Sequence, residues 1–333
     1  MATELVAAAP SEQSVEHDDR VAHHFESAQQ QFDAGKQGMW LFLVTEVLFF
    51  SALFVAYAVY RSNHPEVFIN AHHYLNTTLG TLNTVVLLVS SLTMAWAVRS
   101  AQLNHRRALI TLLTVTLACA SLFLGVKAVE YSHKWDQGLL WAGAFAADEA
   151  TGADHDSDEY ATAASGPRAL IWFSLPFAAW LLVSVIGWVA AARFRRRRAA
   201  VFFRCLASAA GAFFLGVVVG ECVEALTGHA GPAHADPGHE AHATLTPGML
   251  ETSADPAENA KLTGVFFSIY YAMTGVHALH ILAGIGAISW LLWRSIGLEF
   301  DADYFGPVDY VGLYWHLVDL VWIYLFPLLY LIR

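Results

Sequence analysis

Two ionisable residues lie in the middle of an apolar segment near the end of the chain. His316 and Asp319 are three residues apart within the apolar run 308–332, so one helical step places both side chains on the same helix face. The run is long enough to cross a bilayer. A carboxylate near the middle of a membrane is costly unless a partner satisfies it. We therefore expect other parts of the chain to supply partners for this pair.

Four further polar side chains lie inside other apolar runs. They are Glu46, Asn83, His277 and His280. The two histidines share a helix face, and we favour a hydrogen-bonded network between them and the His316–Asp319 pair over a haem, copper or zinc site. For Glu46, a structural contact between helices and a role in proton relay or partner contact are equally supported. Asn83 is interpreted as a residue that joins membrane helices.

A third polar group closes the apolar run 109–129. Glu130 and His133 have the spacing of one half of a di-iron carboxylate site, but the sequence contains no second motif of this kind. Lys127 precedes Glu130 by three residues, which predicts an ion pair along one helix. We therefore place Glu130 at a helix interface, and we expect no catalytic residue and no metal ligand in the chain.

The composition is typical of a multi-pass membrane protein. Of the 333 residues, 56% are hydrophobic and only 14% are charged. The net charge of −11 arises mainly from three polar stretches, at about 1–35, 148–159 and 236–258, so the apolar part is close to neutral. Seven apolar runs are near or above the ~20 residues that a membrane helix needs. These runs are 39–60, 79–98, 109–129, 169–192, 199–226, 262–293 and 308–332. They predict an all-α polytopic membrane protein with seven transmembrane helices.

Basic residues predict the orientation of these helices. Arginines concentrate in the second, fourth and sixth connections, most densely at 193–198, and such connections face the cytoplasm. The N-terminus is then cytoplasmic and the C-terminus lies outside. Two long outer connections follow, at about 132–167 and 227–260. The second contains His229, His234, His239 and His242. Its glycines and prolines favour a solvated tract over a metal site.

Several of these segments resemble subunit III of the haem–copper respiratory oxidases, the cytochrome c oxidase subunit III family. The similar segments are 38–50 (from GMWLF to EVLFF), 82–88 (LNTVVLL), the pair Glu130-Tyr131, 274–280 (TGVHALH) and 314–322 (YWHLVDLVW). They cover about 36–135 and 260–333, and the last two motifs are specific. Glu46 occupies the position of the family's buried glutamate.

The resemblance implies a five-helix family core with an inserted two-helix hairpin. Residues 1–37 would form a soluble acidic N-terminal arm, and 38–135 and 261–333 would form the core helices. The insertion, 136–260, would carry helices 169–192 and 199–226 between flexible outer segments. Its two helices would leave the flanking core helices in their family orientation, in agreement with the basic residues.

The resemblance also implies a function. A subunit III carries no redox centre, because haem and copper belong to partner subunits. It packs mainly on oxidase subunit I, in a complex with subunit II, supports proton uptake and protects the enzyme from inactivation during turnover. We expect this role here, in a bacterial-type inner membrane, with cytochrome c or quinol as electron donor, bound phospholipid and no nucleic-acid partner. The alternatives are an accessory subunit of a nitric oxide reductase and a proton-coupled transporter.

Overall fold

All regular secondary structure in the described part of the chain is helical. The computed structural model describes residues 22–136, 139, 168–227 and 256–332, and it contains no strand within them. Seven of its helices are long and apolar enough to cross a membrane, which confirms the predicted fold class. The helices are α1 (Ala28–Asn63), α2 (Pro65–Ala71), α3 (Thr77–Gln102), α4 (Arg106–Asp136), α5 (Arg168–Arg193), α6 (Arg197–Thr227), α7 (Pro256–Ile296) and α8 (Gly306–Tyr330).

Two features of the N-terminal half differ from the expectation. Helix α1 begins at Ala28, inside the expected N-terminal arm, because the Ser27 hydroxyl caps its first turn by accepting the Gln30 N–H at 3.2 Å. The short helix α2 was not predicted. Its Phe68 is buried with its ring centroid 5.2 Å from that of Tyr57 and 5.1 Å from that of Phe266. Helix α2 is therefore held by packing against α1 and α7.

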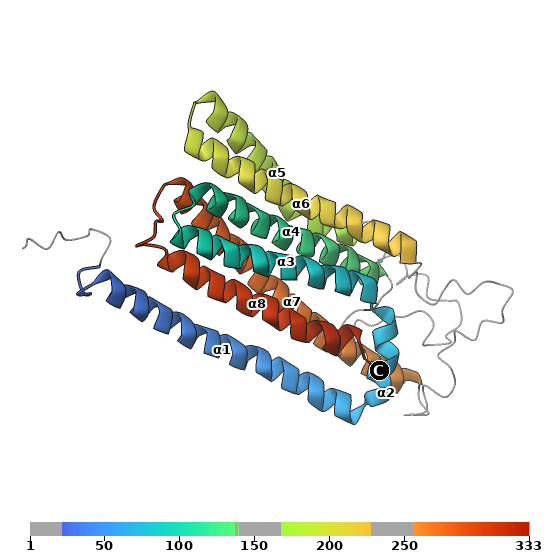
Figure 1. Ribbon diagram of the computed structural model, residues 1–333. Helices are drawn as coiled ribbons and strands as arrows, with labels where there is room; N and C mark the ends of the chain where they lie inside the picture. Colours follow the sequence, from blue (N-terminus) through green and yellow to red (C-terminus); the bar gives the residue numbers. More distant parts are fainter. Residues whose placement is uncertain (1–21, 137–138, 140–167, 228–255, 333) are drawn as a thin grey trace, which may run out of the picture.

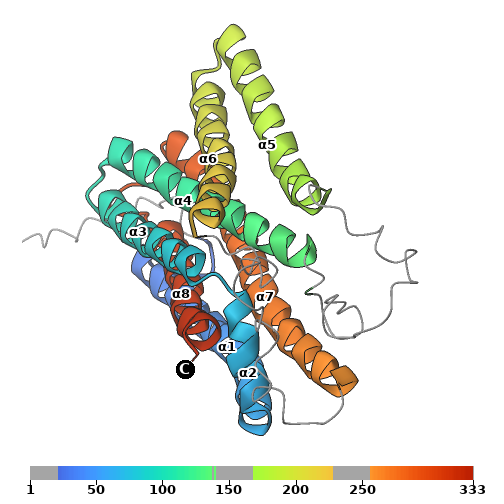
Figure 2. The ribbon, with the colours of Figure 1, turned by 90° about the vertical axis from the view of Figure 1, so that its right-hand side faces the viewer.

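Helices α3, α4, α7 and α8 form the central bundle (Figures 1 and 2). Helix α1 lies beside α7 and α8, and the hairpin of α5 and α6 lies on the opposite side against α4. Trp315 and Trp322 of α8 are fully buried in the bundle. Their indole N–H groups donate to Ser90 Oγ at 2.9 Å and Thr84 Oγ1 at 3.0 Å on α3, so α8 is fixed against α3 by both packing and hydrogen bonds.

Two glycines allow α6 to pack closely on α4. A Cβ atom at Gly125 of α4 would lie closer than 3.0 Å to the Phe213 carbonyl oxygen, and one at Gly216 of α6 would lie equally close to that of Leu122. Backbone atoms cannot move aside as a flexible side chain can, so larger residues would separate the two helices. The hairpin is therefore packed tightly on the bundle.

Helix α1 contacts the bundle mainly through α8. Near its start, the Lys36 ammonium lies 3.1 Å from the Asp309 carboxylate, and the Tyr310 hydroxyl donates to the Phe32 carbonyl at 2.8 Å. Near its end, the Tyr57 hydroxyl donates to the Leu328 carbonyl. Of the most apolar 18-residue stretch of α1, only 11% is buried. Most of the α1 surface therefore faces away from the rest of the described chain.

Candidate functional site

Glu130 of α4 is the centre of the most extensive polar cluster. Its side chain is 1% exposed, and its Oε2 atom lies 2.8 Å from Lys127 Nζ, which confirms the ion pair predicted from the sequence. Its other oxygen, Oε1, lies 2.9 Å from Lys134 Nζ, one helical turn further on. Two buried ammonium groups therefore share one carboxylate.

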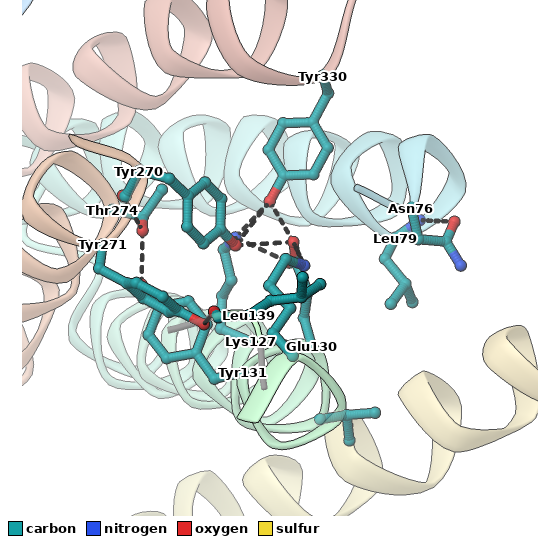
Figure 3. Close-up of polar contacts among 12 residues, drawn as sticks. Asn76, Leu79, Lys127, Glu130, Tyr131, Leu139, Tyr270, Tyr271, Thr274 and Tyr330 are labelled. Atoms are coloured by element: carbon teal, nitrogen blue, oxygen red, sulfur yellow. Dashed lines mark hydrogen bonds and ion pairs between the residues drawn. The ribbon is translucent and has the colours of Figure 1, made fainter. Parts of the chain in front are cut away.

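Tyrosines from two other helices complete this cluster (Figure 3). Tyr270 of α7 and Tyr330 of α8 donate to Glu130 Oε1 at 2.8 and 2.6 Å. Lys127 also donates to the Tyr330 hydroxyl at 2.6 Å, and its ammonium lies 4.8 Å from the centroid of the Trp322 ring. These contacts join α4, α7 and α8. They satisfy each of the buried charges through hydrogen bonds and aromatic faces.

The sequence identified Glu130 and Lys127 but not Lys134, Tyr270 and Tyr330. They lie towards the C-terminal ends of α4 and α8 and in the first half of α7, so comparing the expected depth of each residue in the bundle would have grouped them. His133 does not join them, because its Nε2 atom faces Glu221 Oε1 of α6 at 3.6 Å. Within the described residues, no group of three or more His, Cys, Asp or Glu side chains is arranged to hold a metal ion. The four histidines between 229 and 242 lie outside these residues.

Glu46 of α1 forms a direct contact with His280 of α7. Its Oε2 atom lies 2.9 Å from His280 Nε2, and the other ring nitrogen, Nδ1, lies 2.8 Å from the Val276 carbonyl. A carbonyl can only accept, so Nδ1 must carry a proton. The Nε2···Oε2 contact then holds one proton, either as a neutral imidazole with a carboxylic acid or as an imidazolium with a carboxylate. The pair therefore joins α1 and α7 through a single hydrogen bond.

This pair lies at a partly open position. The Glu46 and His280 side chains are 19% and 20% exposed, and the Phe49 and Phe50 rings lie 6.2 and 5.0 Å from the imidazole. The Tyr314 hydroxyl donates to the His280 carbonyl at 2.8 Å, which ties α8 to the same level of α7. The Glu46–His280 contact thus lies at the α1–α7 interface rather than deep in the bundle.

The expected network among the remaining histidines and Asp319 is wrong. His316 instead contacts Ser91 of α3, with Nδ1 and Oγ 2.8 Å apart. His277 is fully buried, with its ring 5.3 Å from that of Trp322. Among the described side chains, His277 has no hydrogen-bond partner, and the 2%-exposed Asp319 interacts with Ser91 rather than with a histidine. The reason is helix rotation, because α7 turns His280 towards α1 and presents His277 to an aromatic surface.

Asn83, which the sequence predicts to join membrane helices, is enclosed by the described part of the chain. Its side chain is fully buried in α3. Neither its amide nitrogen nor its amide oxygen has a hydrogen-bond partner among the described residues. Asn83 therefore lies at a helix interface without forming the interhelical hydrogen bond that we expect of an amide there.

The fold and these contacts define a class of protein: a multi-pass α-helical membrane protein whose helices are joined by buried polar groups. The family model described as cytochrome c oxidase subunit III matches residues 15–135 and 256–332, together more than half of the chain. The chain belongs to this family. The gap between the two matched segments contains all of α5 and α6.

Individual relatives match over a shorter stretch. Cytochrome c oxidase subunit 3 of Thermostichus vulcanus is 42% identical over 71 residues, which cover 21% of this chain and 35% of the relative. The protein of the same name from Synechocystis is 46% identical over 72 residues, covering 21% and 30%. Heme-copper oxidase subunit I+III of Aeropyrum pernix is 39% identical over 70 residues, covering 21% and 9%. The chain thus spans about a third of the length of the first two relatives, and less of the third.

Proposed function

We propose that this chain is the non-catalytic subunit III of a haem–copper terminal oxidase. It packs on the catalytic subunit, supports proton uptake and protects the enzyme from inactivation during turnover. Haem and copper belong to the partner subunits, and cytochrome c or quinol delivers electrons to the complex. The family membership and the names of the relatives support this role.

The observation that carries the proton-related role is the contact between Glu46 and His280. The two atoms lie 2.9 Å apart, which supports a shared proton that passes between them with little movement of heavy atoms. Partial exposure of both side chains leaves the pair open to exchange with a neighbouring protein. A fully enclosed pair would lack this route.

The proposed orientation places the N-terminus in the cytoplasm. The connections between α3 and α4, α5 and α6, and α7 and α8 lie at the same end of the bundle as the start of α1 (Figure 1). These three connections carry or adjoin most of the arginines, and such a bias is typical of the cytoplasmic side.

Glu46→Gln is expected to leave assembly intact and to shorten the active lifetime of the oxidase. The amide can still donate to His280 Nε2, which preserves the contact, but the pair loses its transferable proton. The initial rate of oxygen uptake should stay near that of the parent, and activity should then decline faster over successive turnovers. The measurement is oxygen uptake over time for the purified complex, with the retained amount of this chain quantified.

Glu66→Gln provides the control, because Glu66 is an exposed carboxylate of the neighbouring helix α2. This variant should match the parent in rate and lifetime. If Glu46→Gln also matches the parent in both, Glu46 contributes only packing and the proton-related role is wrong.

A further inference from the structure

The turn between α5 and α6 carries the densest positive charge in the described part of the chain. We call this region the arginine turn. It contains Arg193, Arg195, Arg196, Arg197, Arg198 and Arg204. All six side chains are exposed. The turn connects two helices that are apolar enough to span a membrane, so its charges lie at a membrane surface.

Three basic residues elsewhere at this end of the bundle have partners, whereas the side chains of the arginine turn have none among the described residues. Arg294 lies 2.5 Å from the Glu299 carboxylate, and Lys36 lies 3.1 Å from that of Asp309. Arg106 donates to the carbonyl groups that end α7, including that of Ile296 at 2.5 Å. No carboxylate of the described residues lies within 4.0 Å of a guanidinium of the arginine turn. Its charges are therefore available to an anion from outside this part of the chain.

Aromatic residues place the turn at the level of lipid headgroups. Phe194, at the tip of the turn, is 75% exposed, and Trp188 and Trp293 are 42% and 48% exposed. The Phe202 ring packs edge-on against Trp293 with the ring centroids 5.0 Å apart. Exposed aromatic rings beside basic residues are typical of the boundary between headgroups and acyl chains. Figure 2 shows the turn at the tip of the hairpin, away from the central bundle.

We propose that the arginine turn binds the phosphate groups of anionic membrane phospholipids and that this binding anchors the tip of the hairpin. A guanidinium presents paired N–H donors that match two phosphate oxygens, so arginine suits this ligand better than lysine. Each basic residue near an anionic surface contributes about fivefold to lipid affinity. Phe194 enters the acyl boundary beside the bound headgroups. The site lies outside the residues that match the family.

The test compares lipids retained by the full protein in its purified complex. The parent is reconstituted into nanodiscs of phosphatidylcholine with a minor share of phosphatidylglycerol. Bound lipid is then identified by native mass spectrometry after transfer to mild detergent. In the Gln variant, four arginines are changed to Gln: Arg195, Arg196, Arg197 and Arg198. Its preference for phosphatidylglycerol should fall by about tenfold or more. In the Lys variant, the same four arginines are changed to Lys. This variant should retain part of the preference, because the positive charge stays but the paired donors of the guanidinium are lost.

The Lys variant keeps the proposal testable if the Gln variant does not fold, and circular dichroism checks the helix content of both. Arg107→Gln, in the connection between α3 and α4, controls for loss of charge on the same membrane side. An unchanged preference for phosphatidylglycerol in the folded Gln variant would overturn the proposal. So would loss of a co-purifying acidic protein from the Gln variant with lipid retention unaltered, since the turn would then bind protein.

Discussion

Glu130→Ala should destabilise the chain by about 3–5 kcal/mol, the cost typical of removing one partner from a buried ion pair. The change would leave Lys127 and Lys134 buried without a carboxylate and would remove the acceptor of the Tyr270 and Tyr330 hydroxyls. Because these groups join α4, α7 and α8, we expect the bundle to loosen at that end. The measurement is the free energy of unfolding of the purified chain in detergent, by denaturant titration.

Two variants separate the loss of the ion pairs from other effects. The triple change Lys127→Met, Glu130→Leu and Lys134→Met removes all three charges together and should recover most of the lost stability. Glu221→Ala removes a carboxylate that is 45% exposed near the same end and should change stability by no more than about 0.5 kcal/mol. Parent-like stability of Glu130→Ala would show that the cluster does not hold the helices together.

Gly216→Ala should destabilise the packing of the hairpin on α4 by about 1–3 kcal/mol. The new methyl group would press on the Leu122 carbonyl, which belongs to the backbone of α4 and cannot rotate away. Gly211→Ala, one and a half turns earlier in α6, provides a matched control with nothing within 4 Å of the new methyl group. That change should stabilise the helix slightly, because alanine has the higher helix propensity.

The two alanine variants are thus expected to change the thermal midpoint in opposite directions. Limited proteolysis of the α5–α6 hairpin should also be faster in Gly216→Ala, since the hairpin would then no longer be packed on α4. Equal shifts of the same sign would contradict the close helix crossing.

The membrane spans and one ion pair were accessible to sequence reasoning because both depend on local patterns. Each span requires a long apolar run, and the Lys127–Glu130 pair follows from a separation of three residues on one helix. The resemblance of 314–322 to a family motif was equally local. The family membership and the all-helical architecture were therefore correctly predicted.

Contacts between different helices were harder to predict, because they depend on how each helix rotates and which helix it adjoins. His280 was expected to face α8, but the packing of α1 beside α7 gives it Glu46 instead. The buried tyrosines at 270 and 330 have no sequence pattern that links them to Glu130. Helix α2 was missed because its seven residues are too few to show a clear period and are held by tertiary packing.

The most direct test of the account is isolation of the complex that contains this chain. The chain is tagged and solubilised in mild detergent, and the purified material is examined by mass spectrometry and by optical spectroscopy. We predict that haem–copper oxidase subunits co-purify, that the haem absorbance follows the catalytic subunit, and that the chain separated from its partners carries none. Recovery of the chain without an oxidase subunit, or of the chain alone with stoichiometric haem, would contradict the assignment of a non-catalytic subunit III.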